Sequence, residues 1–565
     1  MAARPRIAHF AGPNATIQNS PPLVTSNKAR VKHGLPPLTN PDGSRPRFDV
    51  LRAQRLAAPV TVYVQQFSAH PLERDAAELY GPPDGYLDAS GAFCRERQRP
   101  DDVPVYEVVL EPADGVYLLP YMARQADGRP WDEECAHPLA PAHLARQAFY
   151  PDGSRSFEEI DRLGVGENGV GNLISARADV DFYRPLPPAG YVKGLPARER
   201  TDVGEGDIAP EQRGEHFFPY RPYHIAASPP RPALARLTNS VQRVLATGRY
   251  DGAIWTQGSP RIEETLYWLN LLIDTPVPIV GSAAQRPHGM VSNDGPKNLV
   301  DCVEYIVSRI WAGEDGRNRV GVLLLQEQQL FYARDVQKGD ARPGGYVVTG
   351  GHGGIVGGVG HGARPSLTYW PARRHTHSSE VNVTRLPAEI VGVRREEGRL
   401  TRVPITIKDG GGQLVDAAIP RVGIVKDTSY TEDGYLDAPE DEVDLVVELE
   451  RNLRTAPLAG FVVEGHAPYG TMSSPARWAM IQRAARSGMT VACVGRGNNE
   501  GFTPPRGLLI GGGNLTATKA RLLLMACLMR FGSPPPAADP SRVTDAELDA
   551  IREHVARFQA VFDTH

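Results

Sequence analysis

DGAIWTQGSPRIEET, residues 251–265, decides the fold, because it runs from an apolar segment through a short glycine-containing turn into a helix-like segment. Gly258 lets the backbone turn sharply, and Pro260 has a fixed φ that suits the first turn of the following helix. The pattern therefore predicts a strand followed directly by a helix. The hydroxyls of Thr256 and Ser259 then lie near the carboxyl end of that strand, where open α/β sheets bind ligands.

Helices and apolar strands alternate from residue 232 onward, which predicts parallel sheets flanked by helices. In a first unit we expect helices at 233–247, 262–272 and 298–311, and strands at 252–256, 278–281 and 319–325. In a second unit we expect strands at 421–425, 460–464, 490–494 and 508–510, and helices at 475–487 and 516–529. Two alternating runs, 389–394 and 402–408, predict a hairpin between the units. The expected fold class is two-domain α/β, with a parallel sheet flanked by helices in each domain.

The C-terminal residues predict one more helix. Thr544 and Glu547 have the spacing of a capping box. The residues that follow place one apolar stripe on a helix face, made of Leu548, Ile551, Val555, Phe558 and Phe562. Such a stripe predicts core or subunit packing rather than a cofactor site.

The N-terminal part has less regular patterns. Residues 7–11 predict a first strand, after which Thr16 presents a hydroxyl in a turn, and 19–58 predict a loop or flap. Strands are expected at 60–67, 103–110 and 116–122. The glycine-rich run 164–171 lacks the spacing of a phosphate-binding motif and is interpreted as a loop, as is the Gly/His-rich run 344–364.

We therefore expect these segments along the chain: 1–58, first strand and catalytic flap; 59–225, an insertion of unknown role; 226–385, the remainder of the N-terminal α/β domain; 386–418, a connecting hairpin; 419–533, the C-terminal α/β domain; and 534–565, a linker and C-terminal amphipathic helix. The division agrees with the usual size of domains in a chain of 565 residues.

Composition narrows the class of protein. A net charge of -4 gives no overall basic surface for nucleic acid or an anionic membrane. The five cysteines are scattered without a C-x-x-C pair, which favours a reducing compartment. The N-terminus lacks the pattern of a signal peptide, and no apolar run reaches the ~20 residues that span a bilayer. We expect a soluble cytoplasmic protein.

Several blocks, in order, resemble motifs of the bacterial-type L-asparaginase/glutaminase family. Residues 15–17 (ATI) are similar to the end of T-G-G-T-I-A, and 251–264 (DGAIWTQGSPRIEE) to D-G-x-V-I-T-H-G-T-D-T-M-E-E. Residues 279–299 (IVGSAAQRPHGMVSNDGPKNL) are similar to V-V-x-V-G-A-M-R-P followed by S-A-D-G-P-x-N-L. Residues 334–338 (RDVQK) resemble R-D-V-T-K, and 371–376 (PARRHT) resemble P-A-R-K-H-T.

The resemblance implies acyl transfer, in which a hydroxyl attacks an amide, the amine leaves and the acyl-enzyme is hydrolysed. It makes Thr16 the candidate nucleophile, Ser259 the second hydroxyl and Lys338 the group that activates it by proton transfer. A lysine acts as a base only if burial or neighbouring cations lower its pKa. In the family, the partner's C-terminal domain completes the site, so the resemblance also implies a homodimer or homotetramer in which 465–470 face Thr16 across an interface.

The chain also departs from the family motifs. Pro260 stands where the motif has the Asp that holds the substrate α-ammonium, and Arg261 stands where it has Thr. Residues 465–470 (GHAPYG) replace G-x-G-N-G-N, and 495–501 replace S-S-R. Arg261 is suited to carboxylates or polarised carbonyls, although an exposed residue or an ion pair to Glu264 is an equal alternative. We expect a small-molecule amide, lactam or cyclic imide without a free α-amino group.

The remaining candidates are substrate-binding residues and histidines. The predicted substrate-binding set is Gln257, Gly258, Pro260, Arg261, His288, His466 and Tyr469. The histidines at 352, 361, 375 and 377 have no carboxylate or cysteine at metal-site spacing, so we expect no metal and no cofactor. Alternatives are a non-hydrolytic binding or sensor protein with the same fold, a true asparaginase/glutaminase with a rebuilt site, and an ammonia-supplying amidotransferase subunit.

Overall fold

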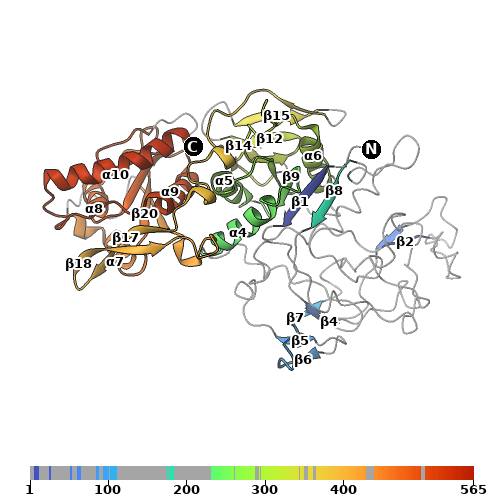
Figure 1. Cartoon of the computed structure of the whole chain (residues 1–565), viewed down its shortest axis with the longest axis horizontal. Coiled ribbons are helices and arrows are strands. Elements are labelled where there is room, and N and C mark those ends of the chain that lie inside the picture. The colour runs from blue at the N-terminus through green and yellow to red at the C-terminus, as the bar shows by residue number, and fades with distance from the viewer. Residues whose placement is uncertain are drawn as a thin grey trace, which may run out of the picture.

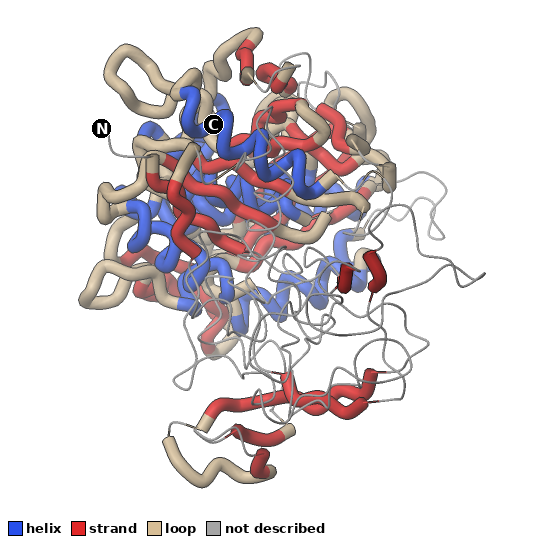
Figure 2. The backbone as a smooth tube through the Cα atoms, turned by 90° about the vertical axis from the view of Figure 1, so that its right-hand side faces the viewer, coloured by secondary structure: helices blue, strands red, loops and turns tan. Residues whose placement is uncertain are grey.

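The computed structural model has two helix-flanked sheets side by side (Figure 1). It describes residues 5–11, 24–26, 51–53, 60–64, 84–87, 93–100, 102–110, 174, 177–182, 231–259, 261–286, 292, 294–342, 344–348, 354–360, 364–427, 438–497 and 503–565. Strands and helices alternate through the same body when the molecule is turned by 90° (Figure 2). None of the helices in these ranges is long and apolar enough to cross a membrane.

The larger sheet has eight strands in the order β16-β15-β12-β11-β10-β9-β1-β8. These strands are β1 (Arg6–Ala11), β8 (Asp179–Phe182), β9 (Gly252–Thr256), β10 (Ile279–Ser282), β11 (Leu323–Gln326), β12 (Gln329–Tyr332), β15 (Ile355–Val359) and β16 (Pro365–Leu367). The strands from β8 to β11 pair in parallel, whereas β12, β15 and β16 are antiparallel. The parallel part places the ends of β9, β10 and β11 at one edge, as expected for a ligand-binding edge.

Strand β9 is buried on both faces, as is typical of a central parallel strand. Trp255 belongs to the hydrophobic core on one face, and Ile254 to the core on the other. The helices that cover the sheet are α4 (Ala233–Leu245), α5 (Ile262–Leu272) and α6 (Gly295–Ser308). At Gly281 of β10 an added Cβ would lie 2.2 Å from Leu266 of α5, so glycine lets this helix pack closely on the sheet.

The smaller sheet contains four parallel strands, β19 (Arg421–Lys426), β20 (Ala459–Gly465), β21 (Thr490–Gly495) and β22 (Ile510–Gly511). Its helices are α7 (Val443–Thr455), α8 (Pro475–Arg486), α9 (Ala517–Phe531) and α10 (Asp545–Thr564). The hairpin β17 (Glu389–Glu396) and β18 (Arg399–Thr406) precedes it. Glu397 and Gly398 both have positive φ, as a tight two-residue hairpin turn requires.

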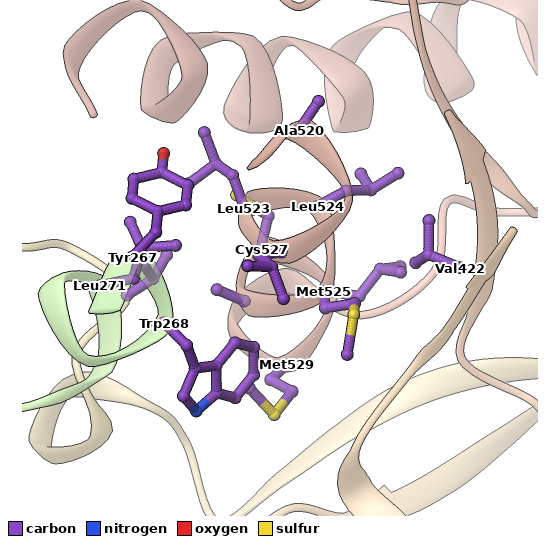
Figure 3. Packing of buried hydrophobic residues seen from close by; sticks show 14 of the residues in the cluster. Tyr267, Trp268, Leu271, Val422, Ala520, Leu523, Leu524, Met525, Cys527 and Met529 are labelled. Carbon is purple, nitrogen blue, oxygen red and sulfur yellow. The ribbon is translucent and has the colours of Figure 1, made fainter. Parts of the chain in front are cut away.

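The two units share one hydrophobic core, and α5 and α9 form its centre. Tyr267, Trp268 and Leu271 of α5 lie against Leu523 and Cys527 of α9 (Figure 3). A polar connection lies beside them, since the fully buried Lys519 donates to the backbone oxygens of Glu263 and Ala333. Helices α5 and α9 are therefore joined by both apolar packing and a hydrogen bond.

The other described elements are short. Strands β2 (Val24–Ser26) and β3 (Leu51–Ala53) pair with each other, and β4 (Val60–Val64), β5 (Gly85–Leu87), β6 (Phe93–Cys94) and β7 (Val103–Leu110) form a separate sheet. Strands β13 (Val336–Lys338) and β14 (Tyr346–Val348) form a two-stranded ribbon. Single 3₁₀ turns cover η7 (Thr376–Ser378), η8 (Val383–Arg385), η9 (Asp416–Ala418) and η10 (Pro439–Asp441).

The expected α/β fold with helix-flanked parallel sheets is confirmed, as is the capping box of α10. The α10 stripe is core packing, with the rings of Phe531 and Phe558 5.4 Å apart. The domain boundaries stay a prediction, although β8 shows that residues within 59–225 extend the main sheet beside β1.

Several local expectations are wrong. The run 344–364, expected to be a loop, contains β14 and β15, and 19–58 contains the pair β2–β3. The pattern of β15 is interrupted by Gly357. Glycine is needed there because an added Cβ would lie 2.0 Å from the backbone oxygen of Ser366. A glycine needed for this close approach of strands weakens the usual strand pattern. Helix α7 was also missed, and the expected strand 116–122 and the run 164–171 lie outside the described residues.

Candidate functional site

The end of β9 is a buried polar segment that leads into the turn before α5. The imidazole Nε2 of His9 lies 2.9 Å from Thr256 Oγ1, which joins the ends of β1 and β9. The indole of Trp255 donates to Gln257 Oε1 at 2.9 Å. Gln257 is 6% exposed, so its described role is to satisfy this indole, and its predicted role in substrate binding stays a prediction.

Ser259, Lys338, Gln285 and Tyr346 converge just beyond this strand end. The ammonium of Lys338 donates to Gln285 Oε1 at 2.6 Å, and Ser259 Oγ donates to the same oxygen at 3.4 Å. The phenol of Tyr346 donates to Ser259 Oγ at 3.1 Å, and its ring lies 4.5 Å from Lys338 Nζ. A hydroxyl and an amine thus share one amide oxygen, and a phenol donates to the hydroxyl, which is a constellation suited to proton transfer.

Lys338 lies at the end of β13, where its backbone N–H donates to the Glu263 carboxylate of α5. Burial lowers the pKa of Lys338, and the carboxylates of Asp340, Asp294 and Glu263 oppose this shift. Burial also raises the pKa of Glu263, with Lys519 acting in the opposite direction. A lysine acts as a base only if its pKa is lowered, and the pKa of Lys338 lies below its ordinary value.

Asp294 holds the loop that carries Gln285. Its carboxylate is 5% exposed and accepts the backbone N–H groups of Gln285 at 3.0 Å and of Arg286 at 2.8 Å. The side chains of Asn298 and Gln326 also donate to it. A buried carboxylate is costly without hydrogen-bond donors, so Asp294 keeps all four of these contacts. One of the four is the backbone N–H of Gln285, which is thereby held in place.

Arg261 is exposed at the N-terminal end of α5. Glu264, the alternative ion-pair partner of Arg261, pairs with Arg521 of α9 at 2.8 Å. Gly258 and Ser259 are half-buried in the same turn. Arg261 and Gly258 stay predicted substrate-binding residues.

His466 and Tyr469 lie at the carboxyl edge of the other sheet. Arg496 donates to His466 Nδ1 at 3.2 Å, so the neutral ring has its proton on Nε2, which lies 2.8 Å from Ser473 Oγ. Ser473 Oγ donates in turn to the buried Asp427 carboxylate at 3.1 Å. Because the base nitrogen faces Arg496, this Ser-His-Asp set is an ordered network and not a nucleophile with its base.

Three predicted site residues, Thr16, Pro260 and His288, lie outside the described residues, as do His352 and His361. His375 is buried, and burial lowers its pKa to about 4. Within the described ranges no group of three potential ligands is arranged to hold a metal ion. The thiols of Cys302 and Cys493 are buried, and burial raises the pKa of each, as expected for core cysteines.

Sequence analysis missed four residues of this site: Glu263, Gln285, Asp294 and Tyr346. A signal existed for Gln285, which stands where the quoted V-G-A-M-R-P motif has Met, and for Asp294, which matches the motif A-D-G-P. Tyr346 had none, because it lies in the segment that was expected to be a loop.

Comparisons with known proteins match the same block. Residues 230–344 match the family model "Asparaginase, N-terminal", which includes Ser259, Gln285 and Lys338 but not Thr16. A glutaminase-asparaginase of Acinetobacter glutaminasificans is 31% identical over 158 residues, 28% of this chain and 44% of the relative. L-asparaginase 2 of Bacillus subtilis is 36% identical over 107 residues, 19% of this chain and 26% of the relative.

Longer alignments are more divergent. A glutaminase-asparaginase of Pseudomonas aeruginosa is 28% identical over 274 residues, 45% of this chain and 66% of the relative. The solved structure of a probable cytoplasmic L-asparaginase from Campylobacter jejuni aligns with a TM-score of 0.40 and 21% identity over 57% of this chain and 85% of that chain. The chain thus spans less than two thirds of the length of each of these three curated relatives. The family resemblance expected from the motifs is confirmed.

Proposed function

We propose that this chain, whose block 230–344 matches the asparaginase N-terminal family model, is an amidohydrolase that cleaves the C–N bond of an amide, lactam or cyclic imide without a free α-amino group. The observation that supports it best is the convergence of Ser259 Oγ and Lys338 Nζ on Gln285 Oε1 at the carboxyl edge of a parallel sheet. Hydroxyl and amine at such an edge are the parts that acyl transfer requires.

In the proposed reaction, the Thr16 hydroxyl attacks the carbonyl carbon, so a C–O bond forms while the C–N bond breaks. The leaving nitrogen takes up a proton, and water then hydrolyses the ester and regenerates the hydroxyl. Lys338 and Ser259 relay the proton: Ser259 takes the proton of Thr16 as it passes its own to unprotonated Lys338, and Lys338 then supplies the proton that the leaving nitrogen takes up, while the Ser259 oxygen keeps the hydrogen bond from Tyr346. The lowered pKa of Lys338 supports this role, because a base near its pKa transfers protons most effectively.

The substrate class follows from position 260. The family motif has Asp there to hold an α-ammonium group, and this chain has Pro260. Loss of one charge-assisted hydrogen bond costs about 1.5–3 kcal/mol, or roughly 10- to 150-fold in affinity. Arg261, exposed at the start of α5, offers a planar cation for a carboxylate or carbonyl of the substrate instead.

We further propose a homodimer or homotetramer in which a second copy completes the site. Tyr469 is 57% exposed beside His466 at the edge of the smaller sheet, so its ring is accessible to a partner copy. Gln257, Gly258 and His288 complete the proposed substrate-binding set.

A matched pair of substrates tests the proposal. L-asparagine and succinamic acid differ only in the α-amino group, and ammonia release from each is compared for the wild type, Thr16→Ala and Lys338→Met; a lactam and a cyclic imide are followed by chromatography of the ring-opened acid. The wild type should favour succinamic acid by at least about tenfold in kcat/KM, and both variants should lose most activity.

Each other result has a definite meaning. A preference for L-asparagine would indicate a true asparaginase with a rebuilt site. Binding of the amides without turnover, unchanged in Thr16→Ala, would indicate a binding or sensor protein.

A further inference from the structure

Pro260 and Gln285 both differ from the family motifs. Both differences concern the hydrogen-bond acceptor that is available to Lys338. Pro260 stands where the motif has an acidic residue beside the lysine, so no carboxylate is available at that position. Gln285 stands where the motif has Met, a residue with no strong hydrogen-bond acceptor. The chain has therefore lost an acceptor at one position and gained one at another.

The structure places the gained acceptor on the lysine. Gln285 Oε1 lies 2.6 Å from Lys338 Nζ, and the orientation of the amide is defined because an ammonium group has only donors. The same oxygen lies 3.4 Å from Ser259 Oγ. The Gln285 backbone is held in turn by both oxygens of Asp294, at 3.0 and 3.1 Å.

A neutral acceptor and a carboxylate act differently on a lysine. A carboxylate within about 4–6 Å stabilises the charged form and raises its pKa, by about one to three pH units. An amide oxygen orients the amine with much less preference for its charged form, because it contributes a dipole and no net charge. The carboxylates of Asp340, Asp294 and Glu263 already favour the charged form of Lys338, and the neutral oxygen of Gln285 adds no further contribution of that sign.

We propose that Gln285 is a positioning residue that takes the place of the missing turn carboxylate: its single amide oxygen aligns Lys338 with Ser259 while leaving Lys338 free to lose its proton. The proposal rests on the proposed function only in assigning proton transfer to Lys338. It also accounts for the coexistence of both substitutions, since Pro260 removes the carboxylate from the turn before α5 and Gln285 supplies an acceptor to the lysine from the loop after β10.

The experiment measures the pKa of Lys338 directly. The full-length protein is labelled briefly with acetic anhydride across a pH series, and acetylation of the Lys338 peptide is quantified by mass spectrometry. Variants are Gln285→Glu, which supplies a carboxylate of the same length, and Gln285→Met, which restores the motif residue. Gln413→Glu adds the same charge at an exposed distant site, and acetylation of Lys426 serves as an internal control.

Gln285→Glu should raise the pKa of Lys338 by about one to three pH units, and Gln413→Glu should leave it unchanged. Gln285→Met should not raise it, and should lower kcat at least tenfold with KM nearly unchanged. In Gln285→Glu the acidic limb of the kcat/KM profile should move to higher pH by the same amount as the pKa of Lys338.

An unchanged pKa of Lys338 in a folded Gln285→Glu protein would overturn the proposal. A raised pKa in a protein that hydrolyses no amide would instead reject the proposed function and leave the contact between Gln285 and Lys338 in place. Thermal unfolding and circular dichroism of each variant verify that it is folded.

Discussion

The carboxyl edges of the two parallel sheets both gather polar side chains, but they use charge in different ways. At the edge of the larger sheet, Lys338 contacts a neutral amide oxygen and the face of a tyrosine ring. At the edge of the smaller sheet, the buried Asp427 faces Arg477 at 3.1 Å and accepts from Ser473, while Arg496 donates to His466. At the first edge the ammonium of Lys338 makes its hydrogen bond to a neutral group, and at the second the buried Asp427 is paired with a cation.

Under the proposed function, this difference separates a reactive arrangement from a structural one. A lysine held by a neutral acceptor can change its charge during a reaction, whereas an aspartate paired with arginine cannot do so without breaking an ion pair. A Ser-His-Asp set is therefore no evidence for catalysis by itself, since here His466 Nδ1 accepts from Arg496 and Ser473 Oγ donates to Asp427.

The largest expected effect is at the larger sheet. Lys338→Met should lower kcat/KM by about 10²- to 10⁴-fold, because general-base catalysis contributes that much. Lys426→Met is the matched control: this lysine also ends a strand, but it is 67% exposed and pairs with Glu464 at 3.6 Å. Steady-state kinetics with the amide that proves to be the substrate measure both. Equal losses in the two variants would remove the proposed distinction between the edges.

A smaller effect, on stability, is expected at the smaller sheet. Arg477→Ala leaves Asp427, whose side chain is 1% exposed, without its cation, and should lower the free energy of unfolding by about 2–4 kcal/mol. Arg483→Ala on the same helix removes a more exposed pair with Glu440 and should cost about 0–1 kcal/mol. Urea unfolding compares the two variants. Similar values would mean that the Asp427 network is as weakly coupled as a surface pair.

The smallest expected effect concerns the second copy. Tyr469→Ala should raise KM about five- to tenfold, equivalent to about 1 kcal/mol for a truncated interface tyrosine, with little change in thermal unfolding because the ring is 57% exposed. Trp478→Ala, an exposed aromatic on α8 in the same domain, should leave KM unchanged. If neither variant alters KM, the loop at 465–470 is not part of the site.

Sequence patterns predicted the elements near the site better than the contacts within it. The strand β9 and the helix α5 have the bounds expected for them, because local periodicity and the Gly-Ser-Pro turn suffice to define them. The contacts that define the site join residues 26, 53 and 87 positions apart, namely Ser259 to Gln285, Gln285 to Lys338, and Ser259 to Tyr346. No local pattern reports such pairings.

The sequence by itself determined the stretch 251–265 as strand, turn and helix, and its motifs predicted the resemblance to the asparaginase/glutaminase family. These are local properties of backbone preference and residue order. Only the tertiary structure decided what the turn faces: Gln285 and not a carboxylate beside Lys338, Tyr346 above Ser259, and α9 packed against α5. Hydrogen bonds and burial act between side chains brought together by the folded sheet, so the charge state of the site depends on neighbours that the order of residues does not identify.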